Sequence, residues 1–368
     1  MAKEFIIGKT KVGGSNPCFI IAEIGINFDS EYENALKLIE VASKAGCNAV
    51  KFQLFKAETM YTPKAGKYNT ASGKKKDIIS IVKEGELPPG WIPKLKEYAY
   101  KKNLEFFVTT CDENSTDILA KYKVSAFKIA SYEITHIPLL RYTAKKDKPI
   151  IFSSGGSNLS EVIEAMESIK KEGNNNIALM HCIGQYPAPL NSLNLKVISM
   201  LQMVFPNDVI GYSDHSLSPT VAPRVAVALG AKIIEKHITL DKNLPGPDHI
   251  FALNPNELVL MVKTIRQTEK ELKQGKTIKV NPILLGTSER KTSPGETFVR
   301  NFAYRCLFAK DNIKKGEMFS KKNLIVLRPG KIKRGIEPKY YDFLIAKYRA
   351  IRNIPKLKTI NWEDVLLS

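Results

Sequence analysis

The chain has 368 residues, of which 43% are hydrophobic and 25% are charged, and its formal net charge is +19. Because this length exceeds the usual size of one domain, we expect a large α/β domain and a smaller second domain. The composition is that of a soluble globular protein, and without an apolar run of roughly 20 residues the sequence excludes a membrane-spanning protein.

Two further features concern the compartment and the charge. The apolar patch near the N-terminus is too short for a signal peptide, and the five widely spaced cysteines contain no C-x-x-C pair. We therefore expect a cytoplasmic protein without a cysteine-based metal site. Residues 301–368 carry 16 Lys/Arg and 6 Asp/Glu, but no nucleic-acid-binding motif accompanies them. We interpret the excess as a lysine-rich surface, and attraction of a phosphate-bearing substrate is a second interpretation.

Eight short apolar, β-branched runs recur along the first 240 residues, and a helical pattern follows most of them. Near-continuous apolar strands that alternate with helices predict a parallel sheet covered on both faces. Eight such units favour a (β/α)8 barrel, or TIM barrel, although an open sheet of eight strands would also fit. The runs are Phe19–Gly25, Ala49–Phe55, Glu105–Cys111, Ala126–Tyr132, Pro149–Gly155, Ile177–Cys182, Val209–His215 and Lys232–Ile238.

Several segments between these runs have helical periodicity. Glu31–Ala45 ends before a glycine, Ser160–Lys171 begins with Ser160 as its expected N-cap, and Val221–Leu229 joins the last two strands. A fourth helix is expected over Asn256–Leu272. Residues 63–90 form an unusually long excursion after the second strand, on the side where a barrel has its active site, so we interpret them as a candidate lid.

The pattern after the last helix predicts the division into domains. Residues 1–274 are expected to form the barrel domain. Residues 275–300 are rich in Lys, Thr, Ser, Pro and Gly, which is typical of a flexible linker. From residue 301 to residue 368, short strands and turns predict a small second domain.

Polar or charged residues stand at or near the C-terminal ends of seven of the eight runs, where a TIM barrel carries its active site. Two lysines among hydroxyl groups and glycine-rich backbone are typical of a phosphate cradle. The strand-end residues are Glu23, Asn27, Lys51, Gln53, Thr109, Thr110, Lys128, Ser131, Ser153, Ser154, Ser213, Asp214, His215, Glu235 and His237.

Two of the chain's five histidines, His215 and His237, stand at matching places at the ends of neighbouring strands. Their pairing predicts a divalent metal site, with Glu235 and Asp214 as nearby carboxylates. A pair of hydrogen-bonded structural histidines is the alternative. A metal beside a phosphate cradle suits a phosphorylated small molecule that reacts with a polarised carbonyl group.

Nine segments of the chain resemble the sialic acid synthase family, and together they cover nearly its whole length. The combination of GAKIIEKHITLD with GYSDH is highly specific, whereas AEIGIN alone is not. The C-terminal segment resembles the small antifreeze-like (SAF) domain of that family. The segments are AEIGIN (22–27), VKFQ (50–53), FKIAS (127–131), IFSSGG (151–156), YPAP (186–189), GYSDHS (211–216), ALGAKIIEKHITLD (228–241), GPDH (246–249) and KDNIKKGEMFSKKNLIVLRPG (310–330).

The resemblance implies a metal-dependent transferase that condenses phosphoenolpyruvate with an N-acylated six-carbon amino sugar and water, giving a nine-carbon nonulosonic acid and phosphate. Glu23 would position or deprotonate the water, and Glu235 is the second catalytic candidate. His215 and His237 would bind Mn²⁺, with Mg²⁺ or Co²⁺ as alternatives. Phosphoenolpyruvate would be held by Lys51, Thr110, Lys128, Ser131, Ser153 and Ser213.

The resemblance also implies how the sugar is bound and how the subunits assemble. Gln53, Tyr186 and Asp248 would contact the amino sugar. Arg328 would reach it from the small domain of a second subunit, in a homodimer with swapped C-terminal domains.

Two departures from the family pattern leave the sugar open. Phe28 stands where the family usually has His, and Ile183-Gly184-Gln185 replaces Thr followed by Ser or Asn. N-acetylmannosamine is one candidate acceptor, and the di-N-acetylated 6-deoxy sugars of legionaminate or pseudaminate synthases are others. A 3-deoxy-octulosonate-8-phosphate-type synthase would need a second phosphate site, and a non-catalytic carbohydrate- or ice-binding protein would need none of the strand-end residues.

Overall fold

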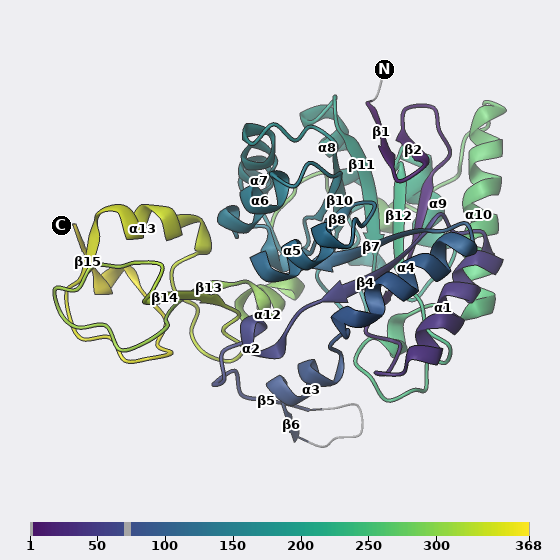
Figure 1. The fold of residues 1–368 in the computed structure, drawn as a ribbon. Helices are drawn as coiled ribbons and strands as arrows, with labels where there is room; N and C mark the ends of the chain where they lie inside the picture. Colours follow the sequence, from purple (N-terminus) through teal and green to yellow (C-terminus); the bar gives the residue numbers. More distant parts are fainter. Residues whose placement is uncertain (1–2, 70–74, 368) are drawn as a thin grey trace.

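The computed structural model describes residues 3–69 and 75–367, and its centre is a closed parallel barrel of eight strands (Figure 1). All eight predicted runs are barrel strands. The first barrel strand, β3, pairs with the last one, β12, as well as with β4. This pairing closes the sheet, and the alternative of an open sheet is wrong. The strands are β3 (Phe19–Gly25), β4 (Ala49–Leu54), β7 (Glu105–Thr110), β8 (Phe127–Ile129), β9 (Ile150–Ser153), β10 (Ile177–Cys182), β11 (Val209–Asp214) and β12 (Ile233–His237).

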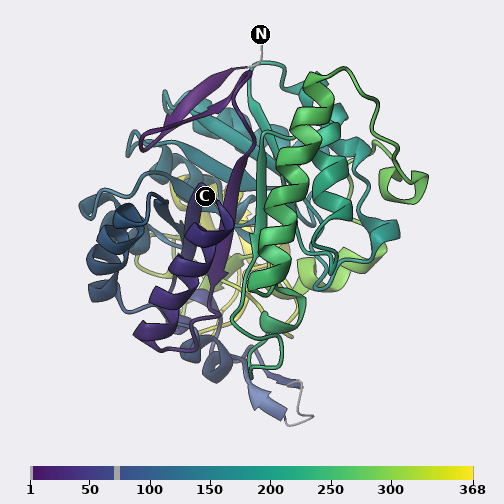
Figure 2. The ribbon, with the colours of Figure 1, turned by 90° about the vertical axis from the view of Figure 1, so that its right-hand side faces the viewer.

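Amphipathic helices cover the outside of the barrel, and Figure 2 shows α1 and α10 side by side. The expected cap of α7 is wrong, because the side chain of Asn158 accepts a hydrogen bond from the Glu161 N–H at 3.0 Å and the helix begins at Leu159. The helices are α1 (Tyr32–Ala45), α4 (Ile92–Lys101), α5 (Glu113–Lys121), α6 (Ile137–Ala144), α7 (Leu159–Lys171), α8 (Lys196–Val204), α9 (Val221–Ala228) and α10 (Pro255–Lys273). Short 3-10 turns occur at Pro89–Trp91, Ser131–Glu133, Leu190–Ser192 and His249–Phe251.

A hairpin that sequence analysis missed closes the N-terminal end of the barrel. Strands β1 (Glu4–Ile7) and β2 (Thr10–Gly13) pair antiparallel and bury Phe5, Ile7 and Val12 against the apolar side chains inside the barrel. Four-residue strands are too short for their alternation to stand out in a sequence.

The two faces of β1 predict opposite effects of mutation. Phe5 is 5% exposed and Ile6 is 55% exposed. We expect Phe5→Ala to lower the free energy of unfolding by about 3–5 kcal/mol, because it leaves a cavity against the barrel interior. Ile6→Ala is the control and should change it by about 0.5 kcal/mol or less. Denaturant titration measures both, and equal effects would show that the hairpin does not pack as a plug.

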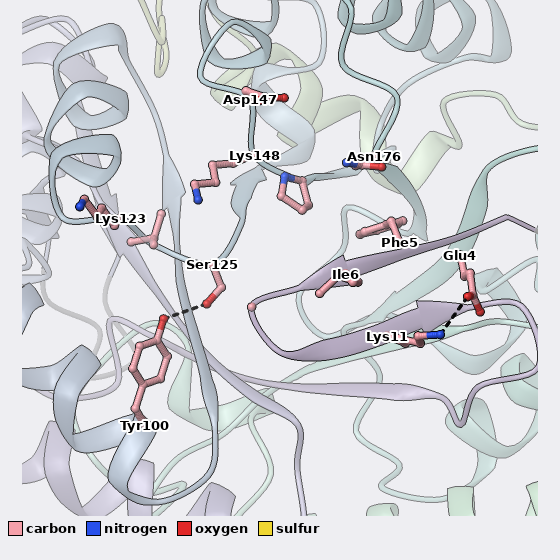
Figure 3. A pocket seen from close by; sticks show the side chains of 13 residues that line it. Glu4, Phe5, Ile6, Lys11, Tyr100, Lys123, Ser125, Asp147, Lys148 and Asn176 are labelled. Atoms are coloured by element: carbon pink, nitrogen blue, oxygen red, sulfur yellow. Dashed lines mark hydrogen bonds and ion pairs between the residues drawn. The ribbon is translucent and has the colours of Figure 1, made fainter.

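A cavity of about 690 Å³ opens beside this hairpin (Figure 3). It is lined by residues of β1 and of the turns at the N-terminal ends of β8, β9 and β10, and Lys148 points into it. On one side the Tyr100 and Ser125 hydroxyl groups hydrogen-bond at 3.0 Å. The cavity lies at the end of the barrel opposite the strand-end residues and contains none of them.

The excursion after β4 packs partly onto the C-terminal side of the barrel. It follows α2 (Ala57–Met60) and contains β5 (Lys67–Asn69), β6 (Lys75–Asp77) and α3 (Ile78–Glu84). Ala65 and Ile78 join a buried cluster with Phe55, Met60 and Tyr61. Residues 70–74 lie outside the described part of the chain, and the function of the excursion as a lid stays a prediction.

Residues 275–300 are a packed connection, so the prediction of a flexible linker is wrong. They contain α11 (Pro282–Leu285) and the start of α12 (Pro294–Ala303). Arg290 and Glu296 are 4% and 0% exposed. The lysines and serines that suggested a flexible chain lie on its outer side, whereas these two charges are buried against the barrel.

The small C-terminal unit lies beside α2 and α12, at one side of the barrel (Figure 1). It has its own apolar core, which includes Leu307, Phe319 and Ile354. These features agree with the predicted small domain. Its elements are β13 (Cys306–Ala309), β14 (Leu324–Leu327), the 3-10 turn Pro338–Tyr340, α13 (Tyr341–Lys347), β15 (Tyr348–Ala350), the 3-10 turn Trp362–Asp364 and β16 (Val365–Leu367). Among the helices of residues 3–69 and 75–367, none is long and apolar enough to span a membrane.

Candidate active site

Each barrel strand contributes one inward side chain to a polar layer near the C-terminal end of the barrel. Successive strand residues point to opposite faces, so a residue two positions after an inward apolar residue also points inward. Ile21, Phe107 and Ile151 belong to the inner apolar cluster, which places Glu23, Thr109 and Ser153 inside. The complete layer is Glu23, Lys51, Thr109, Lys128, Ser153, Cys182, Ser213 and Glu235.

Two lysines and two carboxylates form a buried network in this layer. The Lys51 ammonium lies 3.0 Å from Glu23 Oε2 and 3.4 Å from Glu235 Oε1. The Lys128 ammonium lies 3.3 Å from Glu235 Oε1 and 2.6 Å from Ser153 Oγ. All four charged residues are at most 5% exposed. Buried charges are tolerated when paired in this way, and a phosphate group would find two cations here.

The two carboxyl groups have opposite pKa shifts. Burial raises the pKa of Glu235, but the Lys128 and Lys51 ammonium groups lower that pKa by more than burial raises it. Glu235 therefore stays ionised. Burial raises the pKa of Glu23 more than Lys51 lowers it, and the nearby Glu235 raises it again. Such a divergence separates a fixed counter-ion, Glu235, from a carboxyl group with a raised pKa that is suited to proton transfer, Glu23.

The two histidines predicted to bind metal lie together, with ring centroids 5.6 Å apart. His215 Nδ1 donates to the Ile183 carbonyl oxygen at 3.0 Å, which leaves its Nε2 available as a ligand. Burial lowers the pKa of both rings, most strongly that of His237, so both are neutral. His237 Nδ1 is buried without a hydrogen-bond partner among the described residues and lies 3.8 Å from Asp248 Oδ2.

These donors fit a divalent metal held by two neutral imidazoles. The described residues contain no group of three or more His, Cys, Asp or Glu side chains placed to hold a metal ion. The remaining coordination positions would therefore be filled by water and substrate, as in a catalytic site that keeps open positions.

Two strand-end residues point to the outside of the barrel. Asp214 Oδ2 lies 2.6 Å from the Lys236 ammonium, and both side chains are fully buried, so the prediction that Asp214 is a carboxylate of the metal site is wrong. The Thr110 hydroxyl bonds Ser115 and Thr116 at the start of α5 and lies outside the lysine network. In the network its neighbour Thr109 contacts Lys51 at 3.1 Å.

The outward position of Asp214 predicts a loss of stability without a loss of metal binding. We expect Asp214→Asn to lower the free energy of unfolding by about 3–5 kcal/mol, because it leaves Lys236 buried and unpaired. The double variant Asp214→Asn, Lys236→Met should recover part of that loss. Breaking the exposed pair Lys101–Glu97 with Glu97→Gln is the control, with an expected effect below about 1 kcal/mol. A specific loss of metal affinity in folded Asp214→Asn protein would contradict this assignment.

Three residues predicted to contact the sugar gather around the histidines. The Gln53 side-chain amide donates to Glu23 Oε1 at 2.8 Å. The ring of Tyr186 lies 4.2 Å from that of His215. Burial, assisted by the charge of Glu23, raises the pKa of Asp248 to about 7. The sugar side of the site is thus neutral or acidic.

Arg328 reaches the edge of the site within its own chain. It donates to Glu133 Oε1 at 2.7 Å and its guanidinium lies 5.1 Å from the ring centroid of Tyr132. The Tyr132 hydroxyl bonds that of Tyr186 at 2.8 Å. This contact lies within the one chain that the structure describes, and the expected contact of Arg328 with a second subunit stays a prediction.

Sequence analysis missed two groups near the site. Cys182 occupies the polar layer, and its sulfur lies 3.7 Å from His215 Nδ1. Its run, Ile177–Cys182, is buried on both faces, so the sequence contains no signal for which of its residues point inward. Glu133 lies in the turn after β8 and also pairs with Arg305 at 2.5 Å, and no local pattern distinguishes this carboxylate from a surface one.

The two departures from the family pattern lie in different places. Phe28 is buried, packs on Phe52 and Trp91 with both ring centroids 6.1 Å away, and offers no polar group. Ile183 acts through its carbonyl oxygen on His215, and the Gly184 N–H donates to Glu296 at 2.8 Å. These two residues therefore act through their backbone.

The fold and the site define a class, that of TIM-barrel enzymes with a buried lysine–carboxylate network beside two histidines. Residues 38–277 match the NeuB family, and the chain belongs to this family. It is 52% identical over 363 residues to the spore coat polysaccharide biosynthesis protein SpsE of Bacillus subtilis, covering 99% of this chain and 97% of that protein. The crystal structure of that protein superposes with a TM-score of 0.89 at 50% identity and 99% coverage of each chain.

Two relatives carry names that state a product. The N,N'-diacetyllegionaminic acid synthase of Campylobacter jejuni is 40% identical over 335 residues, which are 89% of this chain and 94% of that protein. The structure of the N-acetylneuraminic acid synthetase of Leptospira borgpetersenii, in complex with citrate, has a TM-score of 0.68 at 35% identity and covers 77% of this chain and 94% of that one. The chain is therefore an enzyme of a family of phosphoenolpyruvate-dependent acid synthases.

Proposed function

We propose that this protein condenses phosphoenolpyruvate with an N-acylated six-carbon amino sugar and water, giving a nine-carbon nonulosonic acid and phosphate. The observation that carries the proposal is the buried network of Lys51 and Lys128 with Glu235, beside Glu23 and the two histidines. Two ammonium groups among the Ser131, Ser153 and Ser213 hydroxyls would hold the phosphate group and stabilise its departure.

The reaction further needs a polarised aldehyde and a water molecule that loses a proton. His215 and His237 would hold a divalent ion, Mn²⁺ in the first instance, which supplies Lewis-acid polarisation of the aldehyde oxygen. Glu23 would take a proton from the water that adds to the enolpyruvate carbon, and its raised pKa supports this role. Glu235 would keep both lysines charged and in place.

The acceptor that we propose is an unphosphorylated amino sugar. Gln53, Tyr186 and Asp248 supply no cation on the sugar side, and Arg328 at its edge pairs with Glu133, which also pairs with Arg305. This arrangement disfavours a phosphorylated sugar and hence the 3-deoxy-octulosonate-8-phosphate-type alternative. The named relatives support either N-acetylmannosamine or a di-N-acetylated 6-deoxy sugar.

A panel of acceptors tests this function. Phosphate release from phosphoenolpyruvate is measured with Mn²⁺ and N-acetylmannosamine, its 6-phosphate, or a di-N-acetylated 6-deoxy hexose. We expect release with at least one unphosphorylated sugar and little with the 6-phosphate. Release that occurs only with the phosphorylated sugar, or with none of them, would refute the proposal.

We further propose a cytoplasmic homodimer in which the small C-terminal domain of one chain caps the barrel of the other, so that Arg328 acts between subunits. The five cysteines are unpaired, which supports a reducing compartment. The Arg328–Glu133 contact supports a role of this arginine at the edge of the site, and a domain swap would form the same contact between chains.

Mixed dimers distinguish these two arrangements. Arg328→Ala and Glu23→Gln chains, each inactive alone, are mixed until subunit exchange is demonstrated. We expect recovered activity, because in the swapped arrangement one site of each hybrid dimer holds both intact residues. No activity after demonstrated exchange would show that the arginine acts on its own barrel.

A further inference from the structure

Side chains of the packed connection between the two domains, and of the residues just after it, make several hydrogen bonds to one turn of the barrel. This turn, residues 153–157, follows β9 and is called the β9 turn here. Four side chains from residues 290–304 hydrogen-bond three of its carbonyl oxygens, those of positions 154, 155 and 156. The donors are Arg290 to the Ser154 oxygen, Tyr304 to the Gly155 oxygen at 2.6 Å, and Thr292 and Arg300 to the Gly156 oxygen at 2.8 and 2.7 Å.

Glu296 completes this set from the acceptor side. Its Oε1 accepts from the N–H of Gly156 at 2.7 Å and from the N–H of Gly184 at 2.8 Å, which joins the turns after β9 and β10. The other carboxylate oxygen of Glu296, Oε2, accepts from the Ser293 N–H at 3.0 Å. The Arg290 guanidinium lies 3.6 Å from Oε1. Burial raises the pKa of the Glu296 carboxyl group, but Arg290 and the backbone N–H groups lower that pKa by more. The Glu296 carboxyl group is therefore ionised.

The β9 turn lies directly against the lysine network. Ser153 accepts a hydrogen bond from Lys128, and the Gly155 N–H donates to the Ser131 hydroxyl at 2.9 Å. Gly156 has φ +71°, and a Cβ there would lie 3.2 Å from the Tyr304 ring. The backbone of this turn is therefore set by groups from residues 290–304, which sequence analysis assigned to a flexible linker and the start of the small domain.

We propose that Glu296 is a positioning residue of the phosphoenolpyruvate site, which fixes the β9 turn through the N–H groups of Gly156 and Gly184. The inference rests on the proposed function, because that function makes the β9 turn part of the phosphate cradle. Residues that orient a binding group commonly change affinity without touching the ligand. The same contacts couple the cradle to the segment that leads into the small domain.

Glu257 offers a matched control. It is a partly buried glutamate in the first turn of α10, it accepts from the backbone N–H of Asn254 at 2.9 Å, and it pairs with Lys242 at 2.7 Å. Among the contacts described, neither Glu257 nor Lys242 hydrogen-bonds the β9 turn or Gly184. Replacing Glu257 removes the same kind of helix cap and ion pair and leaves both N–H contacts of Glu296 in place.

Equilibrium dialysis with labelled phosphoenolpyruvate tests the inference on the full-length protein. We expect Glu296→Ala to weaken binding about 10-fold or more, with the KM for the amino sugar changed by less than about twofold. Glu296→Gln keeps an oxygen that accepts from both N–H groups and should recover most of the affinity. Glu257→Ala should lower the Tm and leave phosphoenolpyruvate affinity unchanged.

A second variant covers the case in which Glu296→Ala does not fold. Tyr304→Phe removes only the hydroxyl that binds the Gly155 oxygen, and we expect it to weaken phosphoenolpyruvate binding about fivefold. Unchanged affinity in the folded variants, equal losses in Glu296→Ala and Glu257→Ala, or tighter binding in Glu296→Ala would each overturn the inference. Failure of the wild-type protein to bind phosphoenolpyruvate would instead overturn the proposed function.

Discussion

Removal of the divalent metal is expected to abolish turnover, and His237→Ala or His215→Ala should have the same effect. The physical reason is that the aldehyde oxygen gains negative charge as the new carbon–carbon bond forms, and a Lewis acid stabilises that charge by several kcal/mol. Activity is measured after chelation and after addition of Mn²⁺, Mg²⁺ or Co²⁺. Metal content is measured separately by atomic emission, and we expect the two histidine variants to contain little metal.

His181 provides the control for this experiment. It is also fully buried, but it lies on the outer face of β10, where its Nε2 bonds the Leu193 carbonyl oxygen at 2.7 Å. His181→Gln should keep its metal content even if its stability falls. Full turnover by metal-free wild-type enzyme would refute the metal site, as would normal metal content in His237→Ala.

Lys128→Met should weaken phosphoenolpyruvate binding far more than sugar binding. A hydrogen bond to a charged group contributes roughly 1.5–3 kcal/mol, which corresponds to about a 10- to 150-fold higher KM for phosphoenolpyruvate. The KM for the sugar should stay within about twofold. Loss of Lys128 also removes a cation that lowers the pKa of Glu235, so the pKa of Glu235 should rise in this variant.

The matched variant is Lys236→Met. Lys236 is equally buried but stands on the outer face of β12, where it pairs with Asp214. We expect it to reduce stability and to leave both KM values unchanged in the folded protein. An equal rise of both KM values in Lys128→Met would show that the phosphate cradle is misassigned.

The barrel itself could be predicted because each strand has a local signature. A strand buried on both faces reads as a continuous apolar run, and all eight runs are strands within three residues of their predicted ends. The polar residues at their ends identified Glu23, both lysines and both histidines for the same reason, since parallel strands bring their carboxyl ends to one edge. The sequence by itself therefore determined the architecture and most of the site.

Only the tertiary structure decided which of two adjacent polar residues enters the site. Thr109 points inward and Thr110 outward, and Asp214 faces Lys236 while Ser213 faces Glu235. Successive side chains of a strand point to opposite faces of the sheet. The residue types at a strand end therefore do not show which of two neighbours points into the barrel, and this is known only once the inner apolar cluster is seen.

The contacts distant in sequence were likewise decided by the tertiary structure. Glu296 meets Gly156 across 140 positions, and Arg328 meets Glu133 across 195. Nothing in the lysine- and serine-rich connection distinguishes a buried glutamate from a solvated one, because two of the N–H groups that bind it lie in the distant turns after β9 and β10. Strands and helices follow from interactions within a few residues, whereas the pairing of buried charges depends on which distant segments the closed barrel brings together.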